Sequence, residues 1–435
     1  MLQILSNPVT LSVIVMTALC LLKLNVILSL LLAAMVAGLS SGMSIGDIMG
    51  YIIEGLNGNG TNAVAYLLLG TFAAALANTG VANLLGNWIA KNIKERKWVL
   101  LVTFIVIACI SGTIIPIHIA YIPVLIPPLL LMMNRMKLDR RQAACVTEFG
   151  LVAPYTTIPI GYGVIFQGIV ADNMTQNGMA IETREVWPFT IILGIGFLVG
   201  LVAAWIFYNK PREYKDIAIE SREISEADLK LNKDHFVSFI AIAAVLFGQL
   251  YWDSMPLGAL LGLIILIAGG AVKLKDTDAT VIEGIKLMGM ISFIMLIAGG
   301  YANVVRQTGA VDTLIDATLS ILGPSRLAFC IVLIIVGLLI TMGIGTSFGT
   351  IPVIALLYVP MCMRMNISVG ATACMLACAA TLGDAGSPAS DSTLGPTAGL
   401  NADGQHDHIW DTCVPTFLFY NIPLAIAGII GGMLL

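Results

Sequence analysis

The chain has 435 residues, of which 58% are hydrophobic and only 11% are charged, and its mean hydropathy is +0.93. Soluble domains are about one quarter charged, so this composition excludes a soluble protein and predicts an integral membrane protein with room for about a dozen spanning helices. The formal net charge is −4, and nothing in the chain resembles a nucleic-acid site.

Apolar segments separated by polar ones fill the first 207 residues. An amphipathic stretch, Asn83–Lys97, is expected to lie at the membrane surface. The run over residues 98–134 is too long for one helix, and Ser111-Gly112-Thr113 and several prolines interrupt it, which predicts a hairpin. The apolar segments of this half are expected at residues 8–22, 24–43, 62–80, 98–134, 140–170 and 188–207.

The only long polar segment lies in the middle of the chain, and we interpret residues 208–236 as a linker between two domains, residues 1–207 and 237–435. After the linker the series of apolar segments restarts. These segments are expected at 237–252, 256–272, 288–307, 325–365, 369–400 and 413–434.

The restart is an internal repeat. A shift of 229 positions places Gly70 on Gly299, and it also aligns several other Gly, Pro and Arg residues without a gap. Chance matches of apolar residues are common in membrane chains, but matched Gly, Pro and Arg in one register are not. The further matches are Thr79-Gly80 with Thr308-Gly309, Pro123-Val124 with Pro352-Val353, Arg135 with Arg364, and Ala144-Cys145 with Ala373-Cys374.

The distribution of basic residues predicts how the repeats are oriented. If each interrupted run is a hairpin, each repeat crosses the membrane five times, and an odd number of crossings inverts the second copy. On this topology, 18 of the 22 Lys and Arg residues fall on the side of the linker. Because cytoplasmic loops are enriched in Lys and Arg, the linker is predicted to be cytoplasmic and both termini outside.

These features predict the fold class. We expect an all-α integral membrane protein of two inverted repeats, each with five transmembrane helices and a re-entrant hairpin, with broken helices at the midplane. Such repeats with discontinuous helices are typical of secondary transporters. The chain has no G-x-x-x-x-G-K-[ST] motif for ATP, so an ion gradient is the expected energy source.

The two hairpin tips are candidate ion-binding elements. The first is Ser111–His118 (SGTIIPIH) and the second is Gly343–Thr350 (GIGTSFGT). Glycine permits tight turns, hydroxyls and freed carbonyls are oxygen ligands suited to Na+, and helix N-termini can bind a carboxylate. The alternative is that the hydroxyls only pack between helices. The candidates are Ser111, Thr113, Thr346, Ser347 and Thr350, with Na+ expected at Thr346, Ser347 and Asp384.

Two Gly- and Pro-containing stretches predict unwound segments at the same depth, Gly150–Gly161 (GLVAPYTTIPIG) and Gly383–Pro396 (GDAGSPASDSTLGP). Lipid offers no hydrogen-bond partners, so non-helical backbone there must be buried in protein or line a watery cavity. Carboxylates at such a depth are costly and are usually functional. Asp384 and Asp391 are therefore candidates for binding a cation or a substrate ammonium, although Asp391 also suits an exposed loop.

Three other groups have both functional and structural interpretations. Glu148 precedes the first unwound segment and either titrates or pairs with an arginine. His118, whose ordinary pKa is about 6.5, either senses pH, binds a carboxylate or is simply hydrogen-bonded. His406 and His408, with Asp403 and Asp407, have the composition of a metal site, but we expect a solvated cytoplasmic loop. Asn78 and Asn303 are expected to form hydrogen bonds between helices.

These motifs together resemble the NhaC-type Na+/H+ antiporter family, and more closely its bacterial YuiF-like branch, whose members are described as candidate amino-acid permeases with histidine among the solutes considered. The resemblance covers nearly the whole chain, and GDAGSPASDSTLGP is its most specific motif. The other matching motifs are LGTFAAALANTGVANLLGNWIAK, SGTIIPIHIAYIP, APYTTIPIG, IAGGYANVVRQTGAVDTLI and TSFGTIPV.

The resemblance implies an elevator motion of a transport domain against a dimeric scaffold in a bacterial inner membrane. By position it supports Thr346, Ser347, Thr156, Thr157, Asp384 and Ser387 as site residues. Related dicarboxylate symporters have Ser-Asn-Thr at each hairpin tip, whereas this chain has Ser111-Gly112-Thr113 and Gly345-Thr346-Ser347. The missing asparagine argues against the ion site of those symporters.

Two functions are therefore expected, and both are carriers. The first is a Na+- or H+-coupled transporter of a small polar solute, an amino acid, and the second is a Na+/H+ antiporter in which Asp384 or Glu148 binds Na+ and H+ in competition. A channel is disfavoured because conduction needs a continuous pore rather than paired broken helices. An enzyme is disfavoured because the sequence has no nucleophile–base set, and no cofactor beyond the coupling ion is expected.

Overall fold

The computed structural model describes residues 6–22, 24–81, 84, 96–113, 126–217, 231–252, 254–323 and 325–435. In these ranges every regular element is a helix. Among the described residues, five helices are long and apolar enough to span a membrane, and a bent pair makes a sixth span if it is counted as one. The chain is therefore an all-helical, multi-pass membrane protein. The five are Thr183–Phe207, Met288–Gln307, Arg326–Ile344, Ser347–Arg364 and His408–Leu434.

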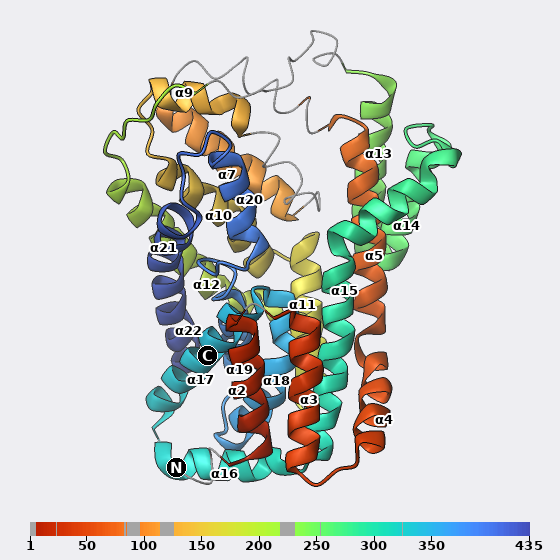
Figure 1. Cartoon of the computed structure of the whole chain (residues 1–435), viewed down its shortest axis with the longest axis vertical. Helices are drawn as coiled ribbons and strands as arrows, with labels where there is room; N and C mark the ends of the chain where they lie inside the picture. The colour runs from red at the N-terminus through yellow and green to blue at the C-terminus, as the bar shows by residue number, and fades with distance from the viewer. Residues whose placement is uncertain are drawn as a thin grey trace.

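The helices form two groups that face each other (Figure 1). One group packs around α15, the longest helix, and the other packs around α10 and α19. The first group contains α3 (Val26–Ser40), α4 (Ile45–Gly55), α5 (Gly60–Asn78), α13 (Lys233–Trp252), α14 (Met255–Ala268) and α15 (Thr277–Gln307). The second contains α7 (Lys97–Thr113), α9 (Leu130–Arg135), α10 (Arg140–Thr157), α11 (Tyr162–Gln176), α12 (Thr183–Phe207), α17 (Arg326–Ile344), α18 (Ser347–Arg364), α19 (Val369–Thr381), α20 (Asp391–Leu400), α21 (Val414–Thr416) and α22 (Ile422–Leu434).

Two helices lie outside these groups. Helix α2 (Pro8–Leu21) packs between α3 and α17, and α16 (Ala310–Leu322) lies across one end of the molecule (Figure 1). Asn7 ties the start of α2 to α16, because its Nδ2 donates to the carbonyl of Ala310 at 2.9 Å. The N-terminus therefore lies at the α16 end.

Helices α17 and α18 form the second predicted hairpin. They join at Gly345, whose φ of +75° places it in the left-handed region that favours glycine. The open end of the hairpin lies at the α16 end, because Arg364 at the end of α18 pairs with Asp316 of α16 at 2.7 Å. The first hairpin is only partly described: α7 ends at Thr113, and the rest of its tip, including His118, lies outside the described residues, as does nearly all of Asn83–Lys97.

The first break lies later than expected. Residues 150–157 belong to α10, and only residues 158–161 separate it from α11, with a bend of 50°. Gly150 serves close packing rather than unwinding, because a Cβ there would lie 2.4 Å from the Cβ of Ala108 on α7. Pro154 is accommodated inside the helix. The expectation that Gly150–Gly161 is unwound throughout is therefore wrong for its first two thirds.

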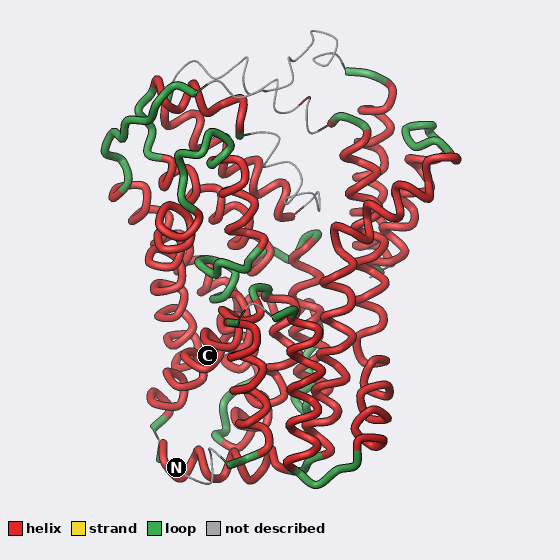
Figure 2. Tube along the Cα trace, viewed as in Figure 1, coloured by secondary structure: helices red, strands yellow, loops and turns green. Residues whose placement is uncertain are grey.

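The second break matches the first half of its prediction. Helix α19 ends at Thr381 and α20 begins at Asp391, so residues 382–390 are non-helical. Ser390 caps α20 by accepting a hydrogen bond from the Ser392 amide at 3.3 Å. This cap explains why residues 391–396, which were expected to be unwound, are helical and include Pro396. Figure 2 shows such non-helical segments at mid-height in the molecule.

The two broken helices run in opposite directions. Helix α10 begins where α20 ends, since Arg140 Nη1 donates to the carbonyl of Leu400 at 2.8 Å. At the other end of the molecule, Gly178 follows α11 and lies next to Met363 near the end of α18. A Cβ added to Gly178 would lie 3.6 Å from the sulfur of Met363. Each broken helix therefore passes from one end of the molecule to the other with its break in between.

Helix boundaries recur at the 229-residue interval found in the sequence. Lys137 and Asn366, two non-glycine residues with positive φ (50° and 51°), are also separated by this interval. Four pairs of helix starts are separated by 229 residues: Val26 and Met255, Lys97 and Arg326, Arg140 and Val369, and Tyr162 and Asp391. Helix α4 was not expected, because its Gly-rich sequence IGDIMGYIIEG has few apolar residues in succession.

Candidate functional site

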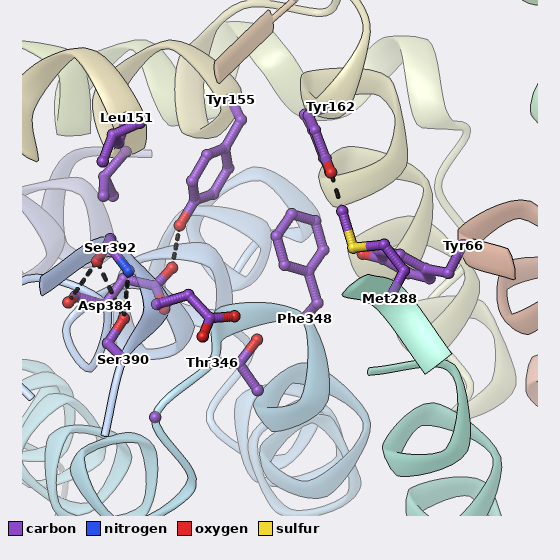
Figure 3. Close-up of a pocket in the computed structure, with 13 residues that line it drawn as sticks. Tyr66, Leu151, Tyr155, Tyr162, Met288, Thr346, Phe348, Asp384, Ser390 and Ser392 are labelled. Carbon is purple, nitrogen blue, oxygen red and sulfur yellow. Dashed lines mark hydrogen bonds between the residues drawn. The ribbon is translucent and has the colours of Figure 1, made fainter. Parts of the chain in front are cut away.

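A small cavity lies between the two helix groups, beside both breaks and the tip of the second hairpin (Figure 3). Its volume is about 40 Å³, which suits an ion or two or three water molecules rather than an amino acid. Tyr66 of α5 and Met288 of α15 line one side, and residues from α10, α11, α18 and α20 line the other. Asp384 and Asp391 are the only charged residues among the described residues that line it.

Asp384 lies in the second break and is 6% exposed. One carboxylate oxygen, Oδ1, accepts the backbone N–H of Ser347 at 3.1 Å. The other, Oδ2, accepts hydrogen bonds from the hydroxyls of Ser347 and Tyr155. Three donors from two other helices therefore hold a buried carboxylate at the cavity wall, as Figure 3 shows for Tyr155.

The tip of the hairpin supplies two of these donors through its backbone shape. Gly345 is left-handed and Thr346 is extended, so α17 ends there and α18 begins at Ser347. The backbone N–H of Ser347 therefore has no acceptor within its own helix and can donate to Asp384. A helix N-terminus favours a negative charge, and the Asp384 carboxylate lies at this one. Thr346 itself lines the cavity.

A second buried carboxylate is connected to the first through one serine. The hydroxyl of Ser392 contacts Glu148 Oε1 and the backbone carbonyl of Asp384, each at 2.8 Å. Glu148 is fully buried on α10, and its Oε2 has no hydrogen-bond partner in the described part of the chain. Glu148 therefore has no arginine partner there, contrary to one of its two interpretations, and a proton or cation could compensate its charge.

Aromatic rings close the cavity on the side of the hairpin. The ring of Phe348 packs against those of Tyr155 at 5.3 Å, Tyr66 at 5.7 Å and Tyr162 at 6.1 Å between centroids. This side of the cavity is therefore mainly aromatic, and the Tyr66 hydroxyl is a buried polar group there without a partner among the described residues.

The structure brings together some of the predicted site residues and separates others. Asp384, Thr346, Ser347, Asp391 and Glu148 gather at or next to the cavity. The hydroxyls of several others donate to backbone carbonyls instead: Thr113 to Cys109, Thr156 to Val152, Thr157 to Ala153, Thr350 to Thr346 and Ser387 to Met342. The hydroxyl of Ser111 is buried without a partner in the described ranges.

Tyr155, Ser390 and Ser392 were missed. Tyr155 lies seven residues after Glu148, and this spacing places both on one face of α10. The spacing could have identified it, but a tyrosine in an apolar segment more often packs in a core. Ser390 and Ser392 lie inside the stretch that was expected to be unwound. There the sequence does not distinguish a serine that caps a helix from one that binds a ligand.

The loop around residues 403–408 is partly exposed, as expected for a solvated loop, but the side chains of Asp403 and His406 are buried in it. Arg140 and Asp403 form an ion pair at 2.5 Å with both side chains at most 1% exposed. Burial raises the pKa of Asp403, but the hydrogen bonds and charge of Arg140 outweigh it and bring the pKa below its usual value. His406 is 2% exposed and contacts Thr412 at 2.7 Å. The described residues contain no cluster of His, Cys, Asp and Glu that could bind a metal.

Comparison with known proteins identifies what the chain resembles. One model described as the Na+/H+ antiporter family matches residues 146–429, and another, the Na+-H+ antiporter family, matches residues 7–93. YuiF of Bacillus subtilis (strain 168), named a candidate amino acid transporter, is 46% identical over 99% of this chain and 100% of its own. These matches confirm the resemblance drawn from the motifs.

Two solved structures share the fold at low sequence identity. MtrF of Neisseria gonorrhoeae, described as illuminating a class of antimetabolite efflux pumps, superposes with a TM-score of 0.61 at 14% identity, covering 98% of this chain and 94% of that one. The YdaH transporter of Alcanivorax borkumensis, described as having an unusual topology, gives a TM-score of 0.58 at 12% identity over 88% and 86%. At such identities the likeness shows the architecture alone.

Proposed function

This chain belongs to the Na+/H+ antiporter family and is a secondary transporter, and from that premise we propose that it couples a Na+ or H+ gradient to the transport of a small polar solute, an amino acid. The observation that carries this proposal is the environment of Asp384. A carboxylate buried at a helix break, bonded by Ser347 and Tyr155 and facing an ion-sized cavity, has the oxygen-rich chemistry that binds Na+ or exchanges a proton. Thr346, Ser347 and Asp384 would supply the oxygens.

The solute class follows from the relative and from the chemistry of the cavity. YuiF is named as a candidate amino acid transporter, and histidine is the first solute to test. The described lining has two carboxylates and no cation, which suits the ammonium group of an amino acid as well as an alkali ion. A cavity of about 40 Å³ admits an amino acid only if the two helix groups move apart.

Such a motion fits an elevator-type transporter built from two inverted repeats, residues 1–207 and 237–435. A two-fold relation predicts that contacts occur in exchanged pairs, and two contacts form one such pair. A Cβ on Gly55 would lie 2.6 Å from the carbonyl of Gly299, and one on Gly70 would lie 2.6 Å from that of Gly284. A shift of 229 residues converts each of these contacts into the other, which supports an inverted repeat.

We place the protein in a bacterial inner membrane as a homodimer that contacts through the α15 group, with both termini outside and residues 208–236 in the cytoplasm. The distribution of charge supports this orientation. Lys97, Lys137 and Arg212 lie at the end of the molecule opposite α16, where Lys97 donates to the carbonyl of Asn209 at 2.9 Å and Lys137 pairs with Glu213 at 2.6 Å. Cytoplasmic loops favour such basic groups.

A Na+/H+ antiporter is the second candidate, and one observation favours it. The Ser392 hydroxyl contacts both Glu148 and the backbone carbonyl of Asp384, so a second buried carboxylate lies next to the small cavity that Asp384 lines. Two carboxylates that share a cation can release protons when it binds, which is the exchange that antiport requires. The size of the cavity also suits ions alone.

One experiment separates the two candidates. Purified protein in liposomes is given a Na+ or H+ gradient, and uptake of labelled amino acids, histidine first, is measured beside Na+-driven proton efflux. Uptake that depends on the gradient, without proton efflux in the absence of an amino acid, supports the symporter. Proton efflux without uptake of any amino acid contradicts it and supports the antiporter.

A further inference from the structure

A second and larger cavity lies along the same boundary between the two helix groups. Its volume is about 360 Å³, in the range of sites for small organic molecules. Glu54 and Gly55 of α4, Asn173 and Gln176 of α11, and Gly299, Ala302, Asn303 and Arg306 of α15 line it. It therefore offers one carboxylate, one guanidinium and three amides.

The second cavity lies on the α16 side of the Asp384 cavity. Helix α11 passes from Tyr162 at the first cavity to Asn173 at the second, and α15 passes from Met288 to Asn303. At 1.5 Å per residue, the two cavities are about 16 Å apart along α11 and about 22 Å apart along α15. A solute that approaches from the α16 end would meet the larger cavity before the smaller one.

Glu54 and Arg306 present opposite charges that do not neutralise each other. Neither forms an ion pair with any described residue. Glu54 is held in place by Asn303, whose Nδ2 donates to the Tyr51 carbonyl at 2.9 Å and to Glu54 Oε2 at 3.4 Å. The close contact between Gly55 and the Gly299 carbonyl brings α4 near enough for this bond.

The repeat supplies an internal control for the structural role of these residues. At the 229-residue interval, Asn303 corresponds to Ala74 and Arg306 to Ala77, whereas Glu54 corresponds to Glu283. Helix packing at this position is therefore satisfied by alanine in the first copy. Glu283 of the first-copy contact also accepts a hydrogen bond from an asparagine, Asn78, at 3.1 Å, so an amide beside this glutamate occurs twice and only the guanidinium of Arg306 has no counterpart.

We propose that this cavity, lined by Glu54, Asn303 and Arg306, is a second binding site that takes a zwitterionic amino acid, with its carboxylate on Arg306 and its ammonium on Glu54. Arginine binds a carboxylate through two parallel hydrogen bonds. Glu54 and Arg306 are both exposed and have no ion-pair partner among the described residues, so a ligand that carries both signs would complement them, which an inorganic ion does not. The choice of an amino acid rests on the proposed function, but the site itself is testable by binding alone.

The test measures binding to the purified full-length protein by calorimetry. Each common L-amino acid is titrated in turn, and the tightest is compared with its α-carboxamide, which lacks the carboxylate charge, and its α-hydroxy acid, which lacks the ammonium. We expect wild-type protein to bind the amino acid at least about tenfold more tightly than either analogue, as hydrogen bonds between charged groups imply. Equal affinities, or no binding of any amino acid, would overturn the site.

Two variants test which residue binds the carboxylate of the amino acid and which binds its ammonium group. R306A introduces the residue that the first repeat has at this position, so it is expected to fold, and it should abolish the preference for the acid over the carboxamide. E54Q should abolish the preference for the amino acid over the hydroxy acid. D278N and K286Q, which remove exposed charges elsewhere on α15, should preserve both preferences. Preferences that persist in R306A and E54Q would overturn the assignment.

A transport readout separates this site from the function of the Asp384 cavity. In liposomes R306A should raise KM about tenfold with maximal rate retained, whereas D384N should abolish coupled transport yet keep the preference for the amino acid over its carboxamide, which depends on Arg306. An unchanged KM in R306A would overturn the second site and leave the transporter standing. Binding with the expected preferences, without transport of any amino acid, would leave the site standing and overturn the proposed function.

Discussion

Tyr155 on α10 donates its hydroxyl hydrogen to Asp384, and the two residues are 229 positions apart. This is the interval that relates the two halves of the chain, so the residues occupy corresponding positions of the repeat and meet each other. One copy supplies the carboxylate and the other supplies its hydrogen-bond donor.

Replacing Asp384 with Asn is expected to abolish ion-coupled transport while the protein still folds. The amide keeps an oxygen that can accept the hydrogen bonds from Tyr155 and Ser347, but it carries no charge to bind a cation or a proton. Coupled uptake in liposomes and the melting temperature in detergent measure the two effects. D278N, which removes an exposed carboxylate from α15, should transport normally. Coupled uptake at the wild-type rate in D384N would remove this residue from the site.

Replacing Tyr155 with Phe should weaken the apparent affinity for the coupling ion about tenfold or more. The ring keeps its packing against Phe348 and Phe166, but the carboxylate loses a hydrogen bond, and such bonds to charged groups contribute about 1.5–3 kcal/mol. The ion dependence of uptake measures this change. Y301F is a matched control, because the Tyr301 hydroxyl is also buried and bonded, to Ser12 at 2.9 Å, away from the cavity. Equal effects in the two variants would indicate a structural role only.

Replacing Gly345 with Ala should destabilise the tip of the hairpin by about 1–2 kcal/mol and lower transport. An L-residue at a φ of +75° is strained, and its Cβ would lie 3.0 Å from Ala389 in the second break. Gly50 offers a contrast, since it is helical on α4 with nothing within 4 Å of an added Cβ. G50A should therefore be neutral or stabilising. Thermal unfolding of both variants measures the difference, and a G345A protein as stable as G50A would show that the turn is not constrained.

The sequence predicts the architecture better than the details of the site. The sequence could predict the repeat, the second hairpin and the position of Asp384 in a break, because glycine, proline and acidic residues are unusual inside apolar segments. The first break was misplaced because Gly150 and Pro154 suggest unwinding, whereas the glycine actually permits α7 to pack closely. Whether a glycine serves a turn or a contact depends on a neighbour that the sequence alone does not identify.

Tyr155 and His406 show a second limit. A tyrosine in an apolar segment and a histidine in a polar loop both have common structural explanations. The hydrogen bond of Tyr155 goes to Asp384, far along the chain, and His406 differs from an ordinary loop histidine by its burial, which lowers its pKa to about 4. Local patterns do not contain that information, although the repeat interval could have paired Tyr155 with Asp384.

Breaking the ion pair between Arg140 and Asp403 should destabilise the protein by about 3–5 kcal/mol, because either single change leaves a buried charge without a partner. Arg140 also binds Asn134 at 2.9 Å and the Leu400 carbonyl at 2.8 Å, so it connects the start of α10 to the end of α20. Thermal unfolding of R140M and D403L measures the loss. The double variant R140M/D403L, which removes both charges, should recover much of it. If the double variant loses the sum of the two single effects, the pair is not coupled.

Stability should fall as the pH is lowered from about 6.5 to about 4 because of His406. Burial lowers the pKa of His406 to about 4, with Asp411 acting to raise it and Arg140 and Arg212 acting to lower it. The unfolded chain binds a proton near pH 6.5, but the folded protein does not until about pH 4, so protons favour the unfolded state across this window. The difference of about 2.5 pKa units corresponds to roughly 3 kcal/mol of stability that is complete above pH 6.5 and lost by pH 4. Melting temperatures measured from pH 8 to pH 4 should show this slope in wild type and a shallower one in H406Q, which keeps a polar group for Thr412 but does not titrate. The same slope in both proteins would assign the acid sensitivity to other groups.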